Sequence, residues 1–347
     1  MEILTSLDQL PPKLAEAEQK QALSDDAFRQ AVSSWCLSTA VWGEVPPDPY
    51  SEAYKAFQLN IYERLTGRPY QVSNEDTTFD FAHELQWPYP YGTQSARTVG
   101  TSLMGYGWLI KKMNLPAGSR ILEIGSGYGS LTIHLASMGY HVTCLDINPA
   151  FLDFIHARTG SLPRPPQTIC GDMATVELDE TFDAVIFNAS LHHSLEHRAV
   201  IRRLDDWVAP HGLVAFTAEP VLGNHAVQLP YPWGIRLDGL SLWSICKWSW
   251  LELGFQEAYF VQMLQDAGWQ LKRSSLGLAG QTDVWLAARE RVDDWYAADT
   301  FAAYGDGEAY GMDLEAEVLR LRQLVAGYEN GRFIRLTKWL KDRTRQK

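Results

Sequence analysis

Residues 121–129 of the 347-residue chain read Ile-Leu-Glu-Ile-Gly-Ser-Gly-Tyr-Gly, the most informative segment of the sequence. A short apolar run leads into three glycines at alternate positions, and a helical pattern follows at Ser130–Met138. Glycine lets the backbone turn sharply and approach a ligand closely, and the amides at the start of the next helix are then free to bind it. The stretch predicts a strand, a ligand-binding turn and a helix.

From this motif onward, short apolar strands alternate with helical stretches. Such alternation predicts a mostly parallel sheet with helices on both faces. The predicted strands are Ile121–Ile124, His141–Leu145, Asp183–Phe187, Leu213–Phe216, Trp269–Arg273 and Val284–Ala288, and the predicted helices between them include Pro149–His156 and Gln256–Ala267.

Three regions are expected along the chain. Residues 1–95 form an N-terminal helical and aromatic cap, and residues 96–290 form the core, with an aromatic insertion at 219–255. Residues 291–347 form a C-terminal extension, most of it one helix. The helices expected in the cap are Ala27–Leu37 and Ser51–Leu65, and the one in the extension is Leu314–Arg345.

Composition narrows the class of protein. Hydrophobic residues make up 46% and charged residues 21%, as in ordinary globular proteins. The net charge of −12 argues against nucleic acid as a partner, because phosphates are bound mainly by basic side chains. The sequence begins with no signal-peptide pattern and holds no apolar run of about 18 residues, so a cytoplasmic protein is predicted.

The four cysteines show no metal-ligand spacing, so no metal site is predicted from them. Cys144 and Cys170 lie in apolar runs and are expected to be buried free thiols. His193 and His197 stand four residues apart, as helical metal ligands do, but no third ligand is indicated. His197 is therefore predicted to be a surface residue.

Acidic residues near the strand ends indicate which cofactor the glycine turn suits. Glu123 precedes the turn, where a carboxylate would repel a pyrophosphate but attract an ammonium or a sulfonium. The third glycine is Gly129, whereas a dinucleotide fingerprint would place it at 130. Asp146 ends the next strand, where an acid can hold both ribose hydroxyls, and Gly171-Asp172-Met173 closes a third strand.

Together these three motifs resemble those of class I S-adenosylmethionine-dependent methyltransferases over residues 100–290. The resemblance implies an α/β fold with a Rossmann-like, mostly parallel sheet of seven strands whose last strand is antiparallel. It implies S-adenosylmethionine as the cofactor. The residues it implies around the cofactor are Glu123, Gly125, Ser126, Gly127 and Gly129 at the methionine moiety, Asp146 at the ribose, Ile147, Asp172 and Met173 at the adenine, with Gly171 and Asn188 beside them.

The segment after the fourth strand, Asn188-Ala-Ser-Leu-His-His-Ser194, is the candidate catalytic segment. It resembles the Leu-His-His segment of small-molecule methyltransferases, including sugar O-methyltransferases. A histidine near an acceptor hydroxyl can remove its proton during attack on the methyl group. His192 and His193 are the candidate bases, and Glu219 can orient the base or hold a neighbouring hydroxyl; in the alternative, one histidine only packs or caps a helix.

Aromatic residues cluster in two segments that flank the predicted cleft. Such walls suit an acceptor with flat apolar faces and a polar rim, such as a pyranose ring or an aromatic metabolite. The alternative is a small core that joins the insertion to the sheet. The candidate substrate-binding residues are Trp87, Tyr89, Tyr91, Tyr231, Trp233 and Arg236.

The last sixteen residues carry seven basic side chains and one acid, with Trp339 among apolar residues at helical spacing. A basic amphipathic helix with Trp can lie on an anionic membrane surface. It can equally dock on the acidic body or on a second copy of the chain, and packing against self is favoured.

The sequence thus predicts an S-adenosylmethionine-dependent O-methyltransferase that acts on a sugar or glycan-linked hydroxyl with a histidine base. Two alternatives stay open. One is methylation of an aromatic or polyketide-like hydroxyl, or of an amine; the other is a cofactor-binding protein whose main role is assembly.

Overall fold

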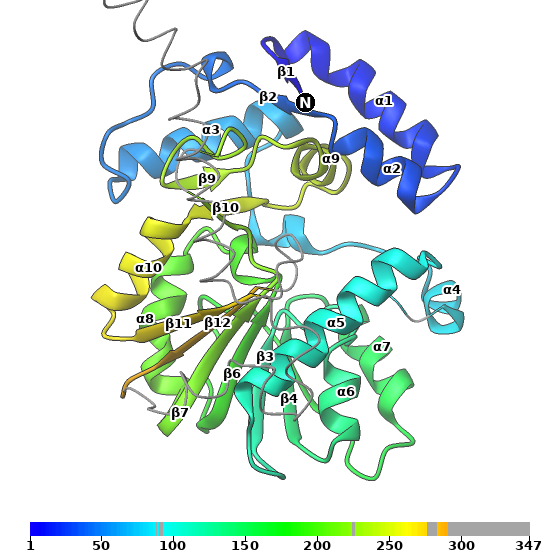
Figure 1. Ribbon diagram of the computed structural model, residues 1–347, viewed down its shortest axis with the longest axis vertical. Helices are drawn as coiled ribbons and strands as arrows, with labels where there is room; N and C mark the ends of the chain where they lie inside the picture. The colour runs from blue at the N-terminus through cyan, green and yellow to red at the C-terminus, as the bar shows by residue number, and fades with distance from the viewer. Residues whose placement is uncertain (88, 90–92, 224–225, 276–282, 291–347) are drawn as a thin grey trace, which may run out of the picture. The chain divides into compact units, whose positions relative to one another are not determined.

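A seven-stranded sheet forms the centre of the computed structural model, which describes residues 1–87, 89, 93–223, 226–275 and 283–290 (Figure 1). The strand order is β11-β12-β7-β6-β3-β4-β5, and only β12 runs antiparallel to its neighbours in this sheet. The predicted fold, a mostly parallel sheet with an antiparallel last strand, is confirmed. The strands are β3 (Arg120–Ile124), β4 (His141–Asp146), β5 (Gln167–Cys170), β6 (Phe182–Asn188), β7 (Val208–Thr217), β11 (Gln270–Ser274) and β12 (Val284–Ala288).

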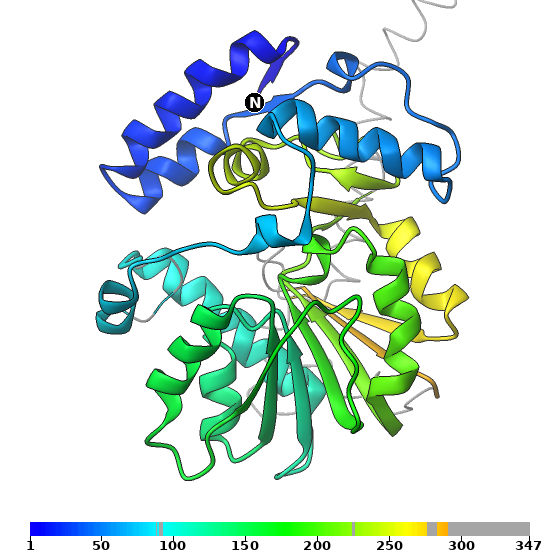
Figure 2. The same cartoon turned by 180° about the vertical axis from the view of Figure 1, so that it is seen from behind.

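Helices cover both faces of the sheet. The connections from β3 to β4 to β5 run in one direction across the sheet, and the connection from β6 to β7 runs in the other. Because such crossovers are right-handed, α8 lies on the face opposite α6 and α7, and α10 packs beside α8 (Figures 1 and 2). The helices are α5 (Ala96–Met113), α6 (Thr132–Ser137), α7 (Pro149–Thr159), α8 (His197–Trp207) and α10 (Glu257–Asp266).

The N-terminal region and the insertion pack together in one layer. Helix α3 contacts α9 and β9, and Cys36 of β2 forms an isolated bridge with Asp238. The N-terminal elements are β1 (Glu2–Leu4), η1 (Leu7–Gln9), α1 (Leu10–Gln21), α2 (Asp25–Val32), β2 (Trp35–Leu37), η2 (Thr39–Val41), α3 (Glu52–Thr66), η3 (Val72–Glu75) and α4 (Phe81–Gln86); the insertion holds β8 (Val221–Leu222), β9 (Trp233–Ile235), α9 (Gly239–Trp248) and β10 (Leu253–Gln256).

This layer touches the sheet at the carboxyl ends of the strands. The hydroxyl of Tyr70 donates to the backbone oxygen of His193, which follows β6, at 3.3 Å. The side chain of Asn148, which follows β4, donates to the backbone oxygen of Thr77 at 2.7 Å. Ligands bind outside the carboxyl ends of strands in open α/β sheets, so the N-terminal layer closes over the expected site.

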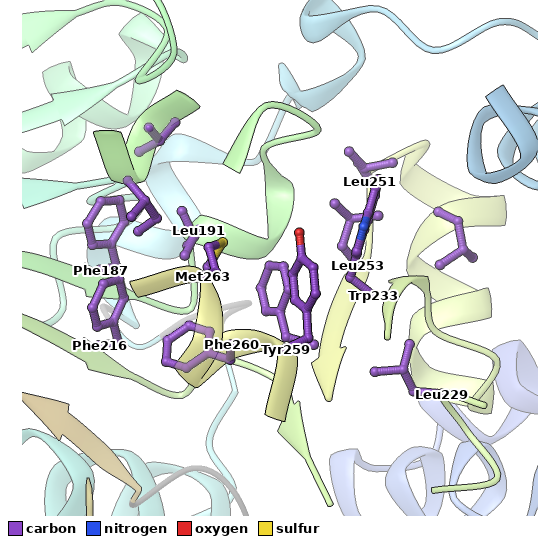
Figure 3. Packing of buried hydrophobic residues seen from close by; sticks show 14 of the residues in the cluster. Phe187, Leu191, Phe216, Leu229, Trp233, Leu251, Leu253, Tyr259, Phe260 and Met263 are labelled. Carbon is purple, nitrogen blue, oxygen red and sulfur yellow. The ribbon is translucent and has the colours of Figure 1, made fainter. Parts of the chain in front are cut away.

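One hydrophobic core runs from the sheet into the insertion. Phe187 of β6 and Phe216 of β7 stack with ring centres 5.1 Å apart. Figure 3 shows the core continuing through Phe260 of α10 toward Trp233 and Leu253 of the insertion. Burial of this shared apolar surface is what joins the insertion to the sheet.

Three local predictions are wrong. The helix predicted at Ala27–Leu37 ends at Val32, and Trp35–Leu37 is a strand, because its side chains are buried between β1 and the insertion. Cys144 is buried as predicted, but Cys170 is exposed because β5 is the edge of the sheet. The predicted surface residue His197 is buried, with Nε2 3.0 Å from the Tyr259 hydroxyl.

The extension at 291–347, with its predicted basic helix, lies outside the described residues. Within the described part of the chain, no helix is both long enough and apolar enough to cross a membrane.

Candidate active site

The glycine turn after β3 adopts a left-handed backbone at each of its three glycines, with φ of 68° at Gly125, 50° at Gly127 and 65° at Gly129. A Cβ on Gly125 would lie 2.5 Å from Cβ of Ser190, and one on Gly129 would lie 2.5 Å from Cγ1 of Ile155. At Gly127 a Cβ would meet nothing within 4 Å. Gly125 and Gly127 line two adjoining cavities, whereas Gly129 lines neither and instead lets α7 approach the turn.

The larger cavity, of about 390 Å³, lies over the ends of β3, β4, β5 and β6. The Asp146 carboxylate is buried there, and it accepts the N–H of Gly127 at 2.7 Å and the N–H of Asn148 at 2.9 Å. Burial raises the pKa of Asp146, and these N–H groups oppose the rise. The structure brings to this wall all the residues predicted at the ribose and adenine: Asp146, Ile147, Gly171, Asp172 and Met173.

The smaller cavity, of about 270 Å³, shares the glycine turn with the larger one. Ser126 and Asn188 line it, as does the hydroxyl-bearing residue Thr217. The buried hydroxyl oxygens of Ser126 and Thr217 have no hydrogen-bond partner among the described residues, and buried polar groups normally have one. The cavity therefore offers polar groups that a ligand can satisfy.

Glu123 lies beneath the turn rather than at its mouth. Its side chain is buried and lines neither cavity, and Oε2 accepts a hydrogen bond from the Thr132 hydroxyl at 2.6 Å. Burial raises the pKa of Glu123 to about 8, which keeps the carboxyl largely protonated at neutral pH. The structure therefore places Glu123 beneath the glycine turn and not on the wall of either cavity, where the sequence predicts it.

Comparisons with known proteins agree with this geometry. Residues 122–216 match the model of a methyltransferase domain. An uncharacterized methyltransferase of Mycobacterium tuberculosis is 36% identical over 103 residues, 29% of this chain and 51% of that protein. A ubiquinone biosynthesis O-methyltransferase of Pseudomonas fluorescens is 30% identical over 112 residues, 32% of this chain and 48% of that protein. The chain thus spans about half the length of these curated relatives.

By this match, residues 122–216 are a methyltransferase domain. Among solved structures, the fold is similar to that of an amino pentose methyltransferase from Micromonospora echinaspora involved in calicheamicin biosynthesis. That protein is 16% identical, with a TM-score of 0.41, and the match covers 62% of this chain and 99% of that one.

Of the two candidate histidines in the methyltransferase domain, only His193 lines the larger cavity. It ends the short helix η5 (Leu191–His193), and its Nδ1 lies 3.2 Å from Oε2 of Glu75. Burial alone would lower the pKa of His193, but the carboxylates of Glu75, Glu252 and Glu219 outweigh it and raise the pKa to about 9. His193 is thus a titratable group on the cavity wall.

His192 and Glu219 form a buried support instead. The Glu219 carboxylate accepts the N–H groups of Ser190, Leu191 and His192 at 2.7, 2.8 and 3.2 Å. Its Oε2 also lies 2.8 Å from Nδ1 of His192, and burial lowers the pKa of His192, so the neutral ring donates to the carboxylate. Neither residue lines either of the two cavities described above, so the structure does not bring them to the cavity wall as the sequence predicts.

Most of the predicted aromatic walls belong to the core. Tyr231 donates its hydroxyl to the backbone oxygen of Ile235, and Trp233 donates its indole N–H to the backbone oxygen of Pro49 at 2.8 Å. Arg236 is ion-paired with Glu252. The side chains of Tyr231 and Trp233 are buried, and that of Arg236 is 17% exposed. None of the three lines either cavity, which fits the alternative of a core that joins the insertion to the sheet.

The three aromatic residues predicted upstream of the first core strand lie in different places. Tyr89 lines the smaller cavity, Trp87 is 41% exposed and lines neither cavity, and Tyr91 lies outside the described residues. The prediction for Trp87 is therefore corrected. Among the cavity-lining residues that the sequence reasoning missed, because no motif marks them, are Arg29, Tyr70, Glu75 and Tyr106.

Nitrogens of His192 and His193 and an oxygen of Glu252 lie within 4.8 Å of one another, a spacing that a metal ion could bridge. Each of the three already has an ionic or hydrogen-bonded partner: Glu219 for His192, Glu75 for His193 and Arg236 for Glu252. We therefore assign no metal to this cluster.

Proposed function

We propose that this protein transfers the methyl group of S-adenosylmethionine to a hydroxyl of a small-molecule acceptor, with a sugar or glycan-linked hydroxyl as the first candidate. One observation carries the proposal: His193 lines the same cavity as Asp146, the predicted ribose-binding carboxylate. A proton-accepting ring and the cofactor wall therefore meet in one space.

The residues present fit this cofactor. Asp146 can accept the ribose hydroxyls, while Ile147 and Met173 provide apolar contacts for the adenine and Asp172 a polar edge. The methionine end would take the smaller cavity, beside Asn188 and the unpartnered hydroxyl of Ser126. When bound, the cofactor supplies an electrophilic methyl group on a sulfonium.

The chain's own contribution is positioning and proton removal. Tyr70 and Trp250 line the larger cavity, where their rings can hold an acceptor and exclude water. A hydroxyl is a weak nucleophile until its proton leaves, and the neutral His193 ring can take that proton. Glu196, on the same wall, can accept hydrogen bonds from further hydroxyls of a polar acceptor, which favours a sugar.

The acceptor can be identified by supplying methyl-labelled S-adenosylmethionine and fractionated cell extract. Label in sugar, glycan or glycolipid fractions supports the proposal. Label in aromatic metabolites or amines contradicts a sugar acceptor and supports methylation of an aromatic hydroxyl or an amine instead. Cofactor binding without transfer to any fraction, or to a panel of purified sugars, favours the assembly role and contradicts the proposal.

The transfer rate is expected to rise with pH. Because the pKa of His193 is raised to about 9, the ring carries a proton at neutral pH and is a base only in the small neutral fraction. We expect kcat/KM to rise about tenfold per pH unit below that pKa and to level off above it. A profile that is flat from about pH 6 to 10 would remove the base role of His193.

Arg29 of α2 is expected to bind the cofactor carboxylate. It is the one Lys or Arg side chain among the described residues that line the smaller cavity, and Asp25 holds its Nε at 2.9 Å. A charge-assisted hydrogen bond contributes about 1.5–3 kcal/mol, so Arg29→Met should weaken S-adenosylhomocysteine binding about 10- to 100-fold.

Methylthioadenosine lacks the amino-acid moiety, so calorimetric titration should show its affinity unchanged in Arg29→Met. Arg68→Met, which removes an exposed arginine of the same region, is the matched control. Equal losses of both ligands in Arg29→Met would contradict a carboxylate contact.

A further inference from the structure

A cluster of buried and partly buried ionisable side chains adjoins the larger cavity at His193. Its members come from segments far apart in the sequence, and burial in one place is unfavourable unless each charge is compensated. The members are Glu75, His192, His193, Glu219, Arg236 and Glu252.

Most of these groups already have a partner other than His193. Glu219 is held by three backbone N–H groups and by His192, and Glu252 is paired with Arg236. Glu75 differs, because His193 is the cationic side chain with which it pairs. The two therefore form the dyad of this cluster that faces the cavity.

Glu75 joins three parts of the chain. It ends η3 in the N-terminal region, and its side chain is only 11% exposed. Oε1 accepts the N–H of Leu251, in the insertion, at 2.8 Å, and Oε2 lies 3.2 Å from Nδ1 of His193, in the methyltransferase domain. One oxygen of the Glu75 carboxylate is thus held by the backbone of the insertion, and the other faces the imidazole of His193.

The imidazole is confined from several directions. Its ring centre lies 4.2 Å from that of His192 and 6.0 Å from that of Trp250, and Tyr70 donates to its backbone oxygen. With Nδ1 toward Glu75, the remaining ring nitrogen is Nε2. A carboxylate that holds one nitrogen of a histidine in this way selects both the tautomer and the orientation of the base.

We propose that Glu75 is a positioning residue for His193, holding the ring at the cavity wall with Nδ1 toward the carboxylate and Nε2 left for the acceptor proton. This inference rests on the methyl transfer proposed above. It makes the N-terminal region part of the active site, since removal of Glu75 leaves the ring without its orienting partner.

The charges around His193 agree with this role. The facing groups are Glu75 from η3, Glu252 before β10, Glu219 after β7, Asp146 at the end of β4 and the neighbouring ring of His192. Burial by itself would lower the pKa of His193, but nearby carboxylates raise it overall. Among these carboxylates, Glu75 has the largest effect. Neutralising Glu75 should therefore lower that pKa more than neutralising any distant acid.

The test compares Glu75→Gln with Glu63→Gln. Glutamine keeps the side-chain length and an oxygen for the Leu251 N–H but removes the charge, and Glu63 is an exposed acid of α3. In protein labelled at histidine, with the His193 signal assigned from His193→Gln, NMR titration should show the His193 midpoint lower by about one pH unit or more in Glu75→Gln and unchanged in Glu63→Gln.

The pH dependence of the reaction should change together with the NMR midpoint of His193. In Glu75→Gln the pH at which kcat/KM levels off should fall by the same amount, and kcat at alkaline pH should fall about tenfold, with KM for the cofactor unchanged. A His193 midpoint equal to that of the unmodified chain overturns the proposal. The NMR titration needs no turnover, so a failure of methyl transfer and a failure of this inference are separate results.

A second variant tests the proposal if Glu75→Gln does not fold properly. Glu75→Asp keeps the negative charge, but its side chain is shorter by one methylene group, so the carboxylate lies farther from His193. A His193 midpoint below that of the unmodified chain, with a reduced kcat, supports the proposal. A midpoint and a kcat equal to those of the unmodified chain overturn it.

Discussion

Replacement of His193 by glutamine should lower kcat for methyl transfer by about 10²- to 10⁴-fold, the usual contribution of a general base. The residue lines the larger cavity beside Asp146, and glutamine occupies similar space without accepting the proton. Single-turnover rates measured with labelled S-adenosylmethionine at about pH 9 would give the effect on the chemical step directly.

Cofactor affinity distinguishes loss of the base from loss of the fold. We expect S-adenosylhomocysteine to bind His193→Gln within about threefold of the unmodified chain, because Asp146 and the glycine turn are untouched. His83→Gln, at a half-exposed histidine of α4, is the control and should retain full activity. A His193→Gln variant that keeps the unmodified rate would show that proton removal uses another group or solvent.

Glu219→Ala should lower the free energy of unfolding by about 3–5 kcal/mol, the cost of breaking a buried charge pair. The carboxylate accepts three N–H groups of the Ser190–His192 turn and the ring of His192, all buried, and alanine leaves these donors without a partner. Urea unfolding followed by fluorescence, analysed with a common slope, measures the difference.

A matched control is Glu257→Ala, which breaks an exposed pair with Arg273 at 2.7 Å. Exposed ion pairs contribute little, so this variant should lose less than about 1 kcal/mol. If Glu219→Ala cost no more than Glu257→Ala, the carboxylate would not be the support of the histidine segment, and its predicted contact with the acceptor would have to be reconsidered.

Much of the fold was predictable because its signals are local. The apolar run at Ile121–Ile124 and the glycines after it are read from neighbouring residues, and most other strands of the sheet are likewise short apolar runs. Asp146 and Asp172 could be placed for the same reason, since each stands at or just after the end of a strand whose position in the sheet follows from chain order.

The aromatic insertion shows where that reasoning failed. Trp233 and Tyr231 have the size and polar tip of ligand-binding residues, and nothing in their spacing distinguishes a cavity wall from a core. The decisive fact is that their polar tips are satisfied by backbone oxygens, that of Trp233 by Pro49, far away in the sequence. Only the tertiary contact shows that no ligand is needed to satisfy them.

Arg29 and Glu75 were missed for the complementary reason. Each stands in the N-terminal region without a motif, and each reaches a cavity because that region folds over the carboxyl ends of the strands. Their chemistry depends on what lies opposite them, His193 for Glu75 and the glycine turn for Arg29, and sequence spacing carries no information on such pairs.

The sheet, the glycine turn, the acids at the strand ends and the candidate histidine pair were therefore predictable, because hydrophobic periodicity and strand-end position are properties of short segments. That His193 faces the cavity while His192 and Glu219 support it from below became visible only in the folded chain. The same holds for Glu75, which completes the site. Burial and the pairing of distant charges depend on which segments the folded chain brings together, and that is a property of the whole core.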